Sequence, residues 1–188
     1  MTVMSLRQCL QMLVERRFPG YTVYYADAKR TKPKPPYITL KLKDAGMSTH
    51  PNEEWRDGAS AKSHPSTAML EINLYTPGVQ INTDAGRGIY QNSAVDELTG
   101  FCLYLEFPAT EVFLFETDLS IELEGKVRDV TAILDCVEPE FRAMAEFLVD
   151  FTSDVTDPFA NEDGIWGNGQ EVIATGYFTS VEITETED

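Results

Sequence analysis

The hydrophobic positions near the start of the chain recur at helical spacing. Ser5, followed by Gln8 three residues later, is typical of a capping box and predicts that a helix begins there. The run Phe18-Pro19-Gly20 predicts where this helix ends. The residues predicted to share its buried face are Leu6, Cys9, Leu10 and Leu13.

In the rest of the first half, β-branched and aromatic residues at 21–26, and alternation of hydrophobic and polar residues farther on, predict strands. We expect strands over residues 21–26, 37–43 and 67–76. Residues 44–66 and 77–92 show almost no periodicity and are rich in glycine, serine, asparagine and proline. They are therefore expected to form two long irregular excursions.

The second half opens with two predicted helices and continues with strands. Ser93 is expected to begin a helix that extends to Leu105, and Pro108 a shorter one that extends to Phe115. Gly125 is expected to end the first strand after them. The strands predicted here cover residues 119–124, 142–152 and 172–184, and residues 127–134 fit either a strand or a turn.

The order of helix, strands, helices and strands indicates an α+β fold. We expect a mostly antiparallel β-sheet flanked by an N-terminal helix and one or two central helices, with long loops. The length fits a single domain over residues 1–188, with the excursions at about 44–66 and 77–92.

Charge is distributed unevenly along the chain. Residues 1–44 carry nine Lys/Arg against three acids, or +6, and residues 45–188 carry six against 28, or −22, which gives −16 in total. One interpretation is a solvated acidic surface. The other is that a basic and an acidic face favour head-to-tail packing of identical subunits, which closes into rings.

Cysteine usage and hydropathy bear on the compartment. The three cysteines are widely spaced and form no C-x-x-C pair, which favours a reducing compartment. Polar residues interrupt the N-terminus too early for a signal peptide, and no segment reaches the length of a membrane span. We therefore expect synthesis in the cytoplasm and no membrane partner.

Candidates for catalysis or metal binding are weak. His50 and His64 each precede a proline in the first excursion, where an exposed histidine is the simpler interpretation. Residues 157–171 resemble a calcium loop, but Phe159 stands where the first carboxylate should be. We expect no enzyme activity, no catalytic residue, no metal and no cofactor.

The second half contains several short motifs in a fixed order. They are Leu105-Glu106-Phe107-Pro108, the segments 119–124 and 127–134, Glu140-Phe141-Arg142-Ala143 and the segment 176–183. The order and spacing of these motifs resemble those of the neck or tail terminator proteins of tailed bacteriophages. The resemblance covers about residues 93–184, together with the general form of the N-terminal helix and first strands. The long stretches 44–66 and 77–92, and residues 161–169, depart from the usual pattern.

The resemblance implies a structural virion protein that is assembled in the host cytoplasm. Such a protein forms a homohexameric ring that caps the tail tube, ends its polymerisation and joins the tail to the head connector. The implied partners are other copies of the chain, the tail tube protein and the connector or neck protein, with the tail sheath as a further candidate. Genomic DNA would pass through the channel without specific binding, because acidic residues repel its phosphates.

Several charged residues are candidates for contacts between subunits or with partners. Glu140 and Arg142 could position a neighbouring subunit, or form a pair within the chain at the start of a strand. Arg128 lies in one of the motifs that carry the resemblance. The basic residues Lys29, Arg30, Lys32 and Lys34 could dock on an acidic partner or lie in a solvated connection.

Three other functions compete with this one. The first is a head-completion or connector protein of the neck, and the second is a non-viral acidic adaptor or DNA mimic. The third is a metal-dependent hydrolase that uses clustered acids.

Overall fold

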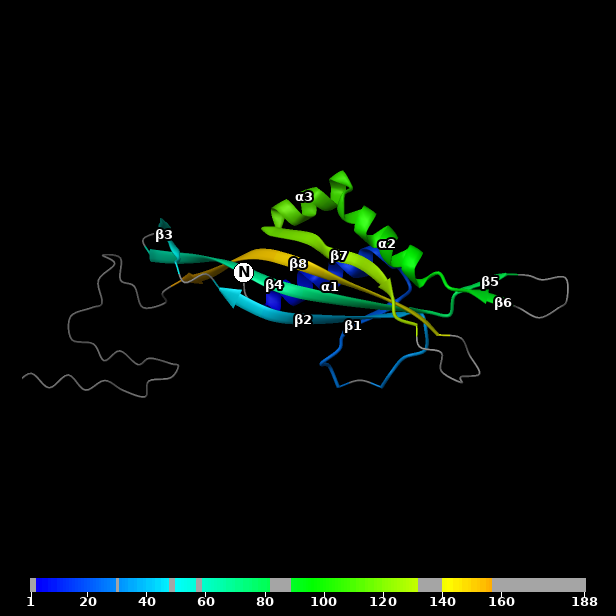
Figure 1. Ribbon diagram of the computed structural model, residues 1–188. Coiled ribbons are helices and arrows are strands. Elements are labelled where there is room, and N and C mark those ends of the chain that lie inside the picture. The colour runs from blue at the N-terminus through cyan, green and yellow to red at the C-terminus, as the bar shows by residue number, and fades with distance from the viewer. Residues whose placement is uncertain are drawn as a thin grey trace, which may run out of the picture. The chain divides into compact units, whose positions relative to one another are not determined.

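A computed structural model describes residues 3–29, 31–47, 50–56, 59–81, 89–131 and 140–156. The chain divides into two compact units. The first contains Met1–Asn52 and Ser63–Asp154, and the second contains Glu53–Lys62 and Val155–Asp188. The helices, the hydrophobic core and most of the β-sheet belong to the first unit (Figure 1).

Three helices and eight strands are found in the described residues. The helices are α1 (Val3–Arg17), α2 (Ala94–Leu105) and α3 (Pro108–Glu116). The strands are β1 (Thr22–Tyr25), β2 (Tyr37–Met47), β3 (Asn52–Arg56), β4 (Ala59–Thr76), β5 (Val79–Ile81), β6 (Ile89–Gln91), β7 (Leu119–Asp129) and β8 (Phe141–Thr156).

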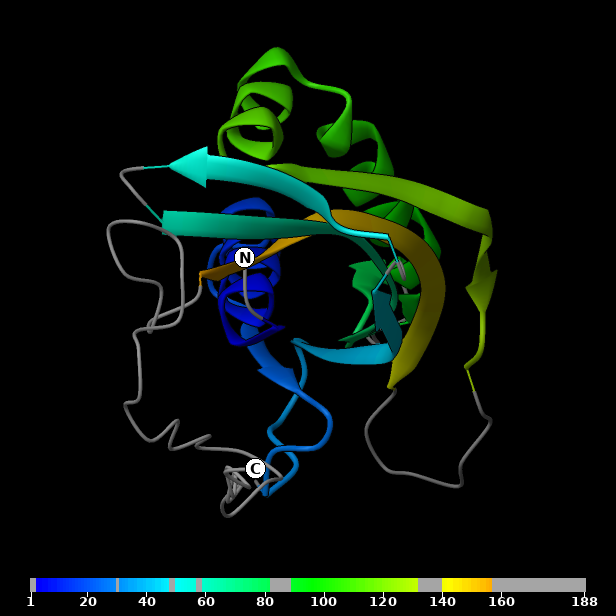
Figure 2. The same ribbon diagram turned by 90° about the vertical axis from the view of Figure 1, so that its left-hand side faces the viewer.

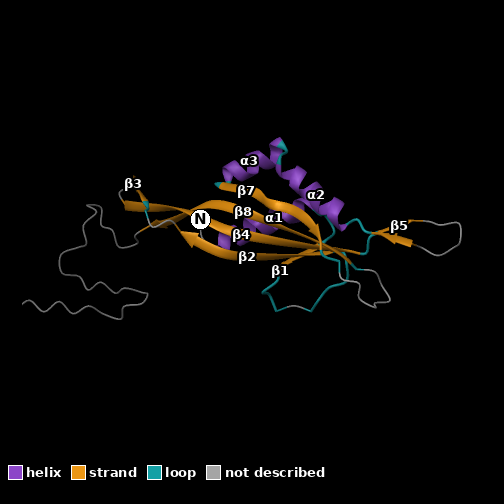
Figure 3. Ribbon diagram, viewed as in Figure 1, coloured by secondary structure: helices purple, strands orange, loops and turns teal. Residues whose placement is uncertain are grey.

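The main sheet has the strand order β1-β2-β4-β8-β7 (Figures 1 and 3). β1 runs parallel to β2, whereas the β2–β4 and β7–β8 pairs are antiparallel. Ile38 lies opposite Leu74, and Leu123 opposite Phe147, so hydrophobic residues of paired strands share a face. β3 pairs with β4, and β5 and β6 form a separate two-stranded hairpin.

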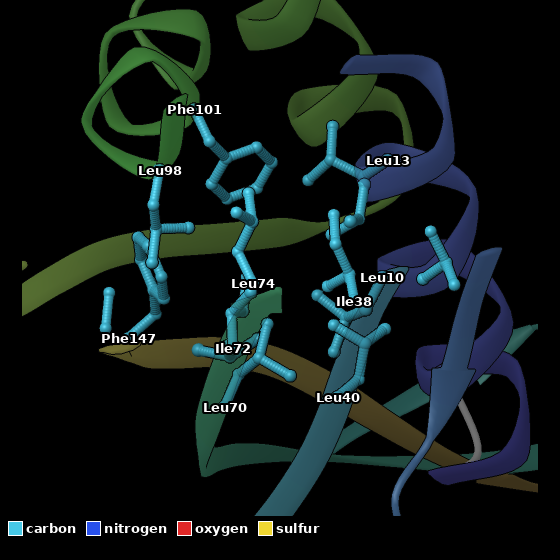
Figure 4. Packing of buried hydrophobic residues seen from close by; sticks show 14 of the residues in the cluster. Leu10, Leu13, Ile38, Leu40, Leu70, Ile72, Leu74, Leu98, Phe101 and Phe147 are labelled. Atoms are coloured by element: carbon cyan, nitrogen blue, oxygen red, sulfur yellow. The ribbon is translucent and has the colours of Figure 1, made fainter. Parts of the chain in front are cut away.

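The helices cover one face of this sheet, and α1 lies on that face in both views (Figures 1 and 2). Leu10 and Leu13 of α1 approach β2, while Leu98 and Phe101 of α2 approach β4 and β8 (Figure 4). Phe101 meets Phe147 edge to face, with 5.7 Å between the ring centroids. The hydrophobic core therefore joins both helices to the middle of the sheet.

Gly100 allows α1 and α2 to approach each other. A Cβ atom at this position would lie 2.9 Å from the guanidinium of Arg17. Arg17 donates a hydrogen bond of 3.4 Å to the Gly100 carbonyl. The low helix propensity of this glycine is thus offset by an inter-helix contact that a side chain would obstruct.

The α+β class, the N-terminal helix and the two central helices are confirmed. The predicted strand over 172–184 lies outside the described residues.

Four local predictions are wrong. α1 begins at Val3, so Ser5 lies within its first turn and does not form the N-cap. Much of the 44–66 segment is strand, because β2 continues to Met47 and β4 begins at Ala59. Gly125 does not end β7, because its positive φ of 84° accommodates a bulge through which the strand continues to Asp129. The 77–92 segment likewise contains β5 and β6.

We predict that Phe147→Ala lowers the free energy of unfolding by about 3–5 kcal/mol, because it leaves a cavity beneath Phe101. Chemical denaturation of the monomer measures this. Phe115→Ala is the matched control, since Phe115 is 87% exposed on α3 and should cost far less. Equal losses from the two substitutions would show that the core is not centred on Phe147.

Candidate interaction surfaces

The face of the sheet that points away from the helices carries polar and aromatic side chains. We call it the open face, because no described helix covers it. Its side chains alternate with the core residues of β2, β4, β7 and β8. They form a connected set of contacts that crosses the sheet.

Three tyrosines form a stack at one end of the open face. The rings of Tyr37 and Tyr75 lie 4.3 Å apart, and those of Tyr24 and Tyr37 lie 6.1 Å apart. The two closer tyrosines are directly opposite in the β2–β4 register. Tyr37 is only 2% exposed, and its burial raises the pKa of the phenol to about 12. The stack is therefore a small apolar core on the polar side of the sheet.

Cations from two segments lie over this stack. Lys32 pairs with Glu140 at 2.7 Å and lies within 6 Å of the Tyr37 and Tyr75 ring centroids. The Arg142 guanidinium lies 5.3 Å from the Tyr75 centroid. These contacts tie the connection between β1 and β2 to the first residues of β8.

Asn73 lies at the centre of the open face. It is 4% exposed, accepts hydrogen bonds of 3.2 and 2.6 Å from Arg142, and donates one of 2.7 Å to Glu71. Both polar atoms of the Asn73 side chain thus have hydrogen-bond partners, which a buried amide requires. Asn73 links the aromatic stack to the charged residues farther along the sheet.

Those charged residues form three linked ion pairs. Lys43 contacts both Glu71 and Glu146, and Arg128 pairs with Glu146 at 2.7 Å. Partial burial acts to raise the pKa of the Glu71 carboxyl, but hydrogen bonds from Lys43 and Asn73 outweigh it and hold the pKa below its usual value. The charge of Glu71 therefore contributes to stability near neutral pH.

The structure brings together four of the seven predicted contact residues. Glu140, Arg142, Arg128 and Lys32 all belong to the open face, but each contacts its own chain, and Glu140 pairs with Lys32. Lys29 and Lys34 are exposed, whereas Arg30 lies outside the described residues.

The β5–β6 hairpin exposes hydrophobic side chains to solvent. Val79 pairs with Gln91, and Ile81 pairs with Ile89, so these residues lie on one face of the hairpin. Val79 is 58% exposed and Ile89 is 56% exposed. In the sequence, the only sign of this hairpin was the alternation of hydrophobic and polar residues around Val79. The many polar residues of the 77–92 segment made that alternation hard to recognise.

A tight junction holds the base of this hairpin. Gly78 has a φ of +79°, which favours glycine, and a Cβ there would lie 2.6 Å from the Phe141 ring and would also meet the Gln91 carbonyl oxygen. The hairpin thus starts directly beside Phe141, at the first residues of β8.

A second exposed hydrophobic surface lies on the two central helices. Val112 and Phe115 are three residues apart on α3 and therefore neighbours on its surface. The exposed apolar residues of this helical patch are Leu103, Phe107, Val112 and Phe115. Such patches mark interaction sites more often than singly scattered residues do.

Beneath the C-terminal end of α3 the surface is hollowed. The hollow has a volume of about 810 Å³. Phe115 stands on its rim, and the chain turns from α3 into β7 through Asp118, whose φ is 54°. Its lining residues are Gly46, Pro65, Ser66, Thr67, Leu114, Phe115, Asp118, Leu119, Ser120, Asp150, Phe151 and Thr152.

Signs of other kinds of site are few in the part of the chain that the structure describes. Within it, no group of three or more His, Cys, Asp or Glu residues could hold a metal ion. His64 lies in β4, and the residues of the calcium-loop candidate are outside the described ranges.

No single described helix is long and apolar enough to span a membrane. The bent pair α2 and α3, at 66°, passes by length and composition alone, and four residues of α2 are buried in the core.

Comparison of the sequence with protein-family models and with curated proteins finds no match.

Replacing Glu71 by glutamine is expected to alter the dependence of stability on pH. Because the folded-state pKa of Glu71 is lowered, its contribution is fully present above the ordinary value of 4.5 and is lost as pH falls through the folded value. The difference in unfolding free energy between wild type and Glu71→Gln should therefore shrink below pH 4.5. Denaturation at several pH values measures it. Glu122→Gln controls for the loss of one negative charge, and a difference that stays constant to lower pH would contradict the assignment.

The hydrogen bonds between Arg142 and Asn73 are expected to appear as a coupling energy. We predict a coupling on the order of 1 kcal/mol in a double-mutant cycle of Asn73→Ala and Arg142→Ala. Denaturation of the four proteins measures it. Strictly additive losses would show that the two side chains do not stabilise each other.

Proposed function

We propose that the chain is a structural component of a bacteriophage neck or tail, not an enzyme. In this role, copies of the chain form a ring, with six subunits expected, that caps the tail tube, ends its growth and joins it to the head connector. The partners are other copies, the tube protein and the connector, and the location is the virion.

The observation that carries the proposal is the exposure of hydrophobic side chains in two separate places. The β5–β6 hairpin and the helical patch each expose large aliphatic or aromatic groups to water. Exposure of this kind is costly for a protein that acts alone and is resolved by burial against other proteins. A tail terminator needs such surfaces for its neighbours in the ring and for the tube.

The fold is compatible with this role. An N-terminal helix, a mostly antiparallel sheet and two central helices follow the order expected from the resemblance. Residues 127–129 and 140–142 of the motifs lie in or next to the paired strands β7 and β8. These motifs therefore have a structural use, because they place Arg128 and Arg142 on one face of the sheet.

The charge distribution favours a channel for DNA. The chain carries a net charge of −16, which is the sum of −22 over residues 45–188 and +6 over residues 1–44. Carboxylates that line a pore repel phosphates, so DNA would pass without adhering. The same charge disfavours a role in binding DNA directly.

Light scattering followed by negative-stain imaging tests the proposal, with and without purified tail tubes. We expect rings with a central pore, or caps at tube ends, and tubes of uncontrolled length when the protein is omitted from assembly. A protein that remains monomeric at high concentration and ignores tube ends would overturn it. Salt-sensitive competition with DNA for a basic partner would then favour an acidic adaptor.

A further inference from the structure

The helix α3 presents an apolar stripe to solvent. Pro108, Val112 and Phe115 follow the spacing i, i+4, i+7 and therefore lie along one side of the helix. All three are exposed, and Phe115 is 87% exposed. Thr110, on the opposite side, is buried, so α3 has a separate face toward the core. The stripe is a second apolar face, and the described part of the chain leaves it uncovered.

A stripe with this spacing is the pattern by which one helix packs against another. Side chains at i, i+4 and i+7 form a ridge that fits between the side chains of a second helix. Leu103 and Phe107, which are 57% and 58% exposed, extend the apolar surface toward α2. Small molecules bind in concave pockets, whereas this surface is a ridge. It therefore fits an amphipathic helix of another molecule.

Two glutamates flank the stripe. Glu111 is a neighbour of Phe115, and Glu116 is a neighbour of Val112, each at a spacing of i, i+4, so the two carboxylates lie on opposite sides of the stripe. Both are exposed, and neither forms an ion pair with a described residue. Charged residues beside the apolar seam of two packed helices select the partner. These flanks select a helix with lysine or arginine beside its own seam.

The surroundings of the stripe carry the same sign of charge. Residues 93–125, which contain both central helices and the start of β7, include eight Asp or Glu and no Lys or Arg. The hollow that Phe115 borders is lined by two aspartates and by no basic residue. Arg16 of α1 approaches α3, but it lies over Phe113, which packs against the core and is not part of the stripe. The charges along the stripe are therefore acidic.

A second copy of the chain does not match this surface. Two α3 helices packed together would bring their glutamate flanks into contact, and like charges across an interface repel each other. Among the described side chains of α1, the exposed ones are Gln8, Met12, Glu15 and Arg16, which include one apolar group and form no seam. The acidic flanks also disfavour an anionic membrane surface.

We infer that the stripe on α3 is the docking site for an amphipathic helix of a different protein, with an apolar seam flanked by lysine or arginine. Burial of the stripe provides the affinity, and the glutamate flanks provide the selection between partners. The inference deepens the proposed function, and it rests on that function only in assigning the helix to another protein of the phage neck or tail.

Two synthetic peptides test the selection. Each is a helix of about 20 residues with the same leucine seam, and the two differ only in the residues beside the seam, which are lysine in one and glutamate in the other. Fluorescence anisotropy of the labelled peptides measures their binding to the full chain. We expect the lysine peptide to bind about tenfold more tightly, and the ratio to shrink as salt is added. Equal binding of the two peptides would overturn the inference.

Charge reversal at the flanks provides a matched comparison. The double variant Glu111→Lys, Glu116→Lys should prefer the glutamate peptide, by roughly tenfold. The control, Glu122→Lys with Glu124→Lys, makes the same change in net charge on exposed residues of β7 and should still prefer the lysine peptide. A general effect of net charge would appear in both double variants and would contradict the docking site.

The apolar part of the contact is tested at Val112, which is 55% exposed. Val112→Asp should weaken binding of the lysine peptide by more than about tenfold, although the added negative charge alone would strengthen it. Met12→Asp places the same charge on α1, where Met12 is 45% exposed, and should leave binding unchanged. Unchanged melting temperatures show that both variants are folded. Wild-type affinity in Val112→Asp would sink the inference.

The same variant identifies two other occupants. Oligomers of the wild type in sedimentation velocity that are lost in Val112→Asp would show that a second copy covers the stripe. Flotation with vesicles of phosphatidylcholine and phosphatidylserine that is lost in this variant would show that a membrane does. Either result would overturn the inference.

Failure of this inference can be distinguished from failure of the proposed function. A protein that caps tube ends but binds both peptides equally would overturn the docking site and leave the tail role standing. A clear preference for the lysine peptide in a protein that stays monomeric and ignores tube ends would support the docking site and overturn the tail role.

Discussion

The packing of α1 and α2 against one face of a curved sheet is the interaction on which the rest of the structure depends. Strands with a period of two residues can bury only half of their side chains against these helices. Leu10, Ile38 and Leu74 belong to that layer, and Phe147 lies beneath α2 (Figure 4). Every residue between these positions in the strands is forced onto the other face, where it needs different partners.

The open face meets that need with hydrogen bonds, ion pairs and stacked rings. An exposed ion pair adds little stability by itself, but here the pairs share members and converge on the buried amide of Asn73. The network also spans β2, β4, β7 and β8, so it fixes the position of each strand relative to its neighbours. A shift of one residue in register would move Tyr37 and Asn73 into the hydrophobic layer.

The sequence was informative wherever periodicity was strong. The leucines of α1 and the alternating residues 37–43 and 67–76 identified the elements and their buried faces. Their ends were harder to predict, because β4 continues through Ser63, His64 and Pro65, which lack hydrophobic alternation. Pairing with neighbouring strands stabilises such residues, and the sequence does not reveal which strands will be neighbours.

The candidate contact residues show the same limit. Glu140, Arg142, Arg128 and Lys32 were identified as important charges, and the structure gives each a partner in its own chain. Asn73, the partner of Arg142, comes from a distant strand, so no local pattern could have named it. The exposed hairpin was missed because a three-residue strand provides too few positions to establish a period.

The weakness of the hairpin has a consequence for the timing of assembly. Residues that become fully ordered only on docking spend part of the contact energy on their own folding, which lowers the affinity of any single encounter. Two free subunits would then separate quickly, whereas subunits held side by side on a template would be retained by several contacts at once. Assembly on a template would therefore be faster than assembly in free solution, and the two three-residue strands of the hairpin would set the size of that difference.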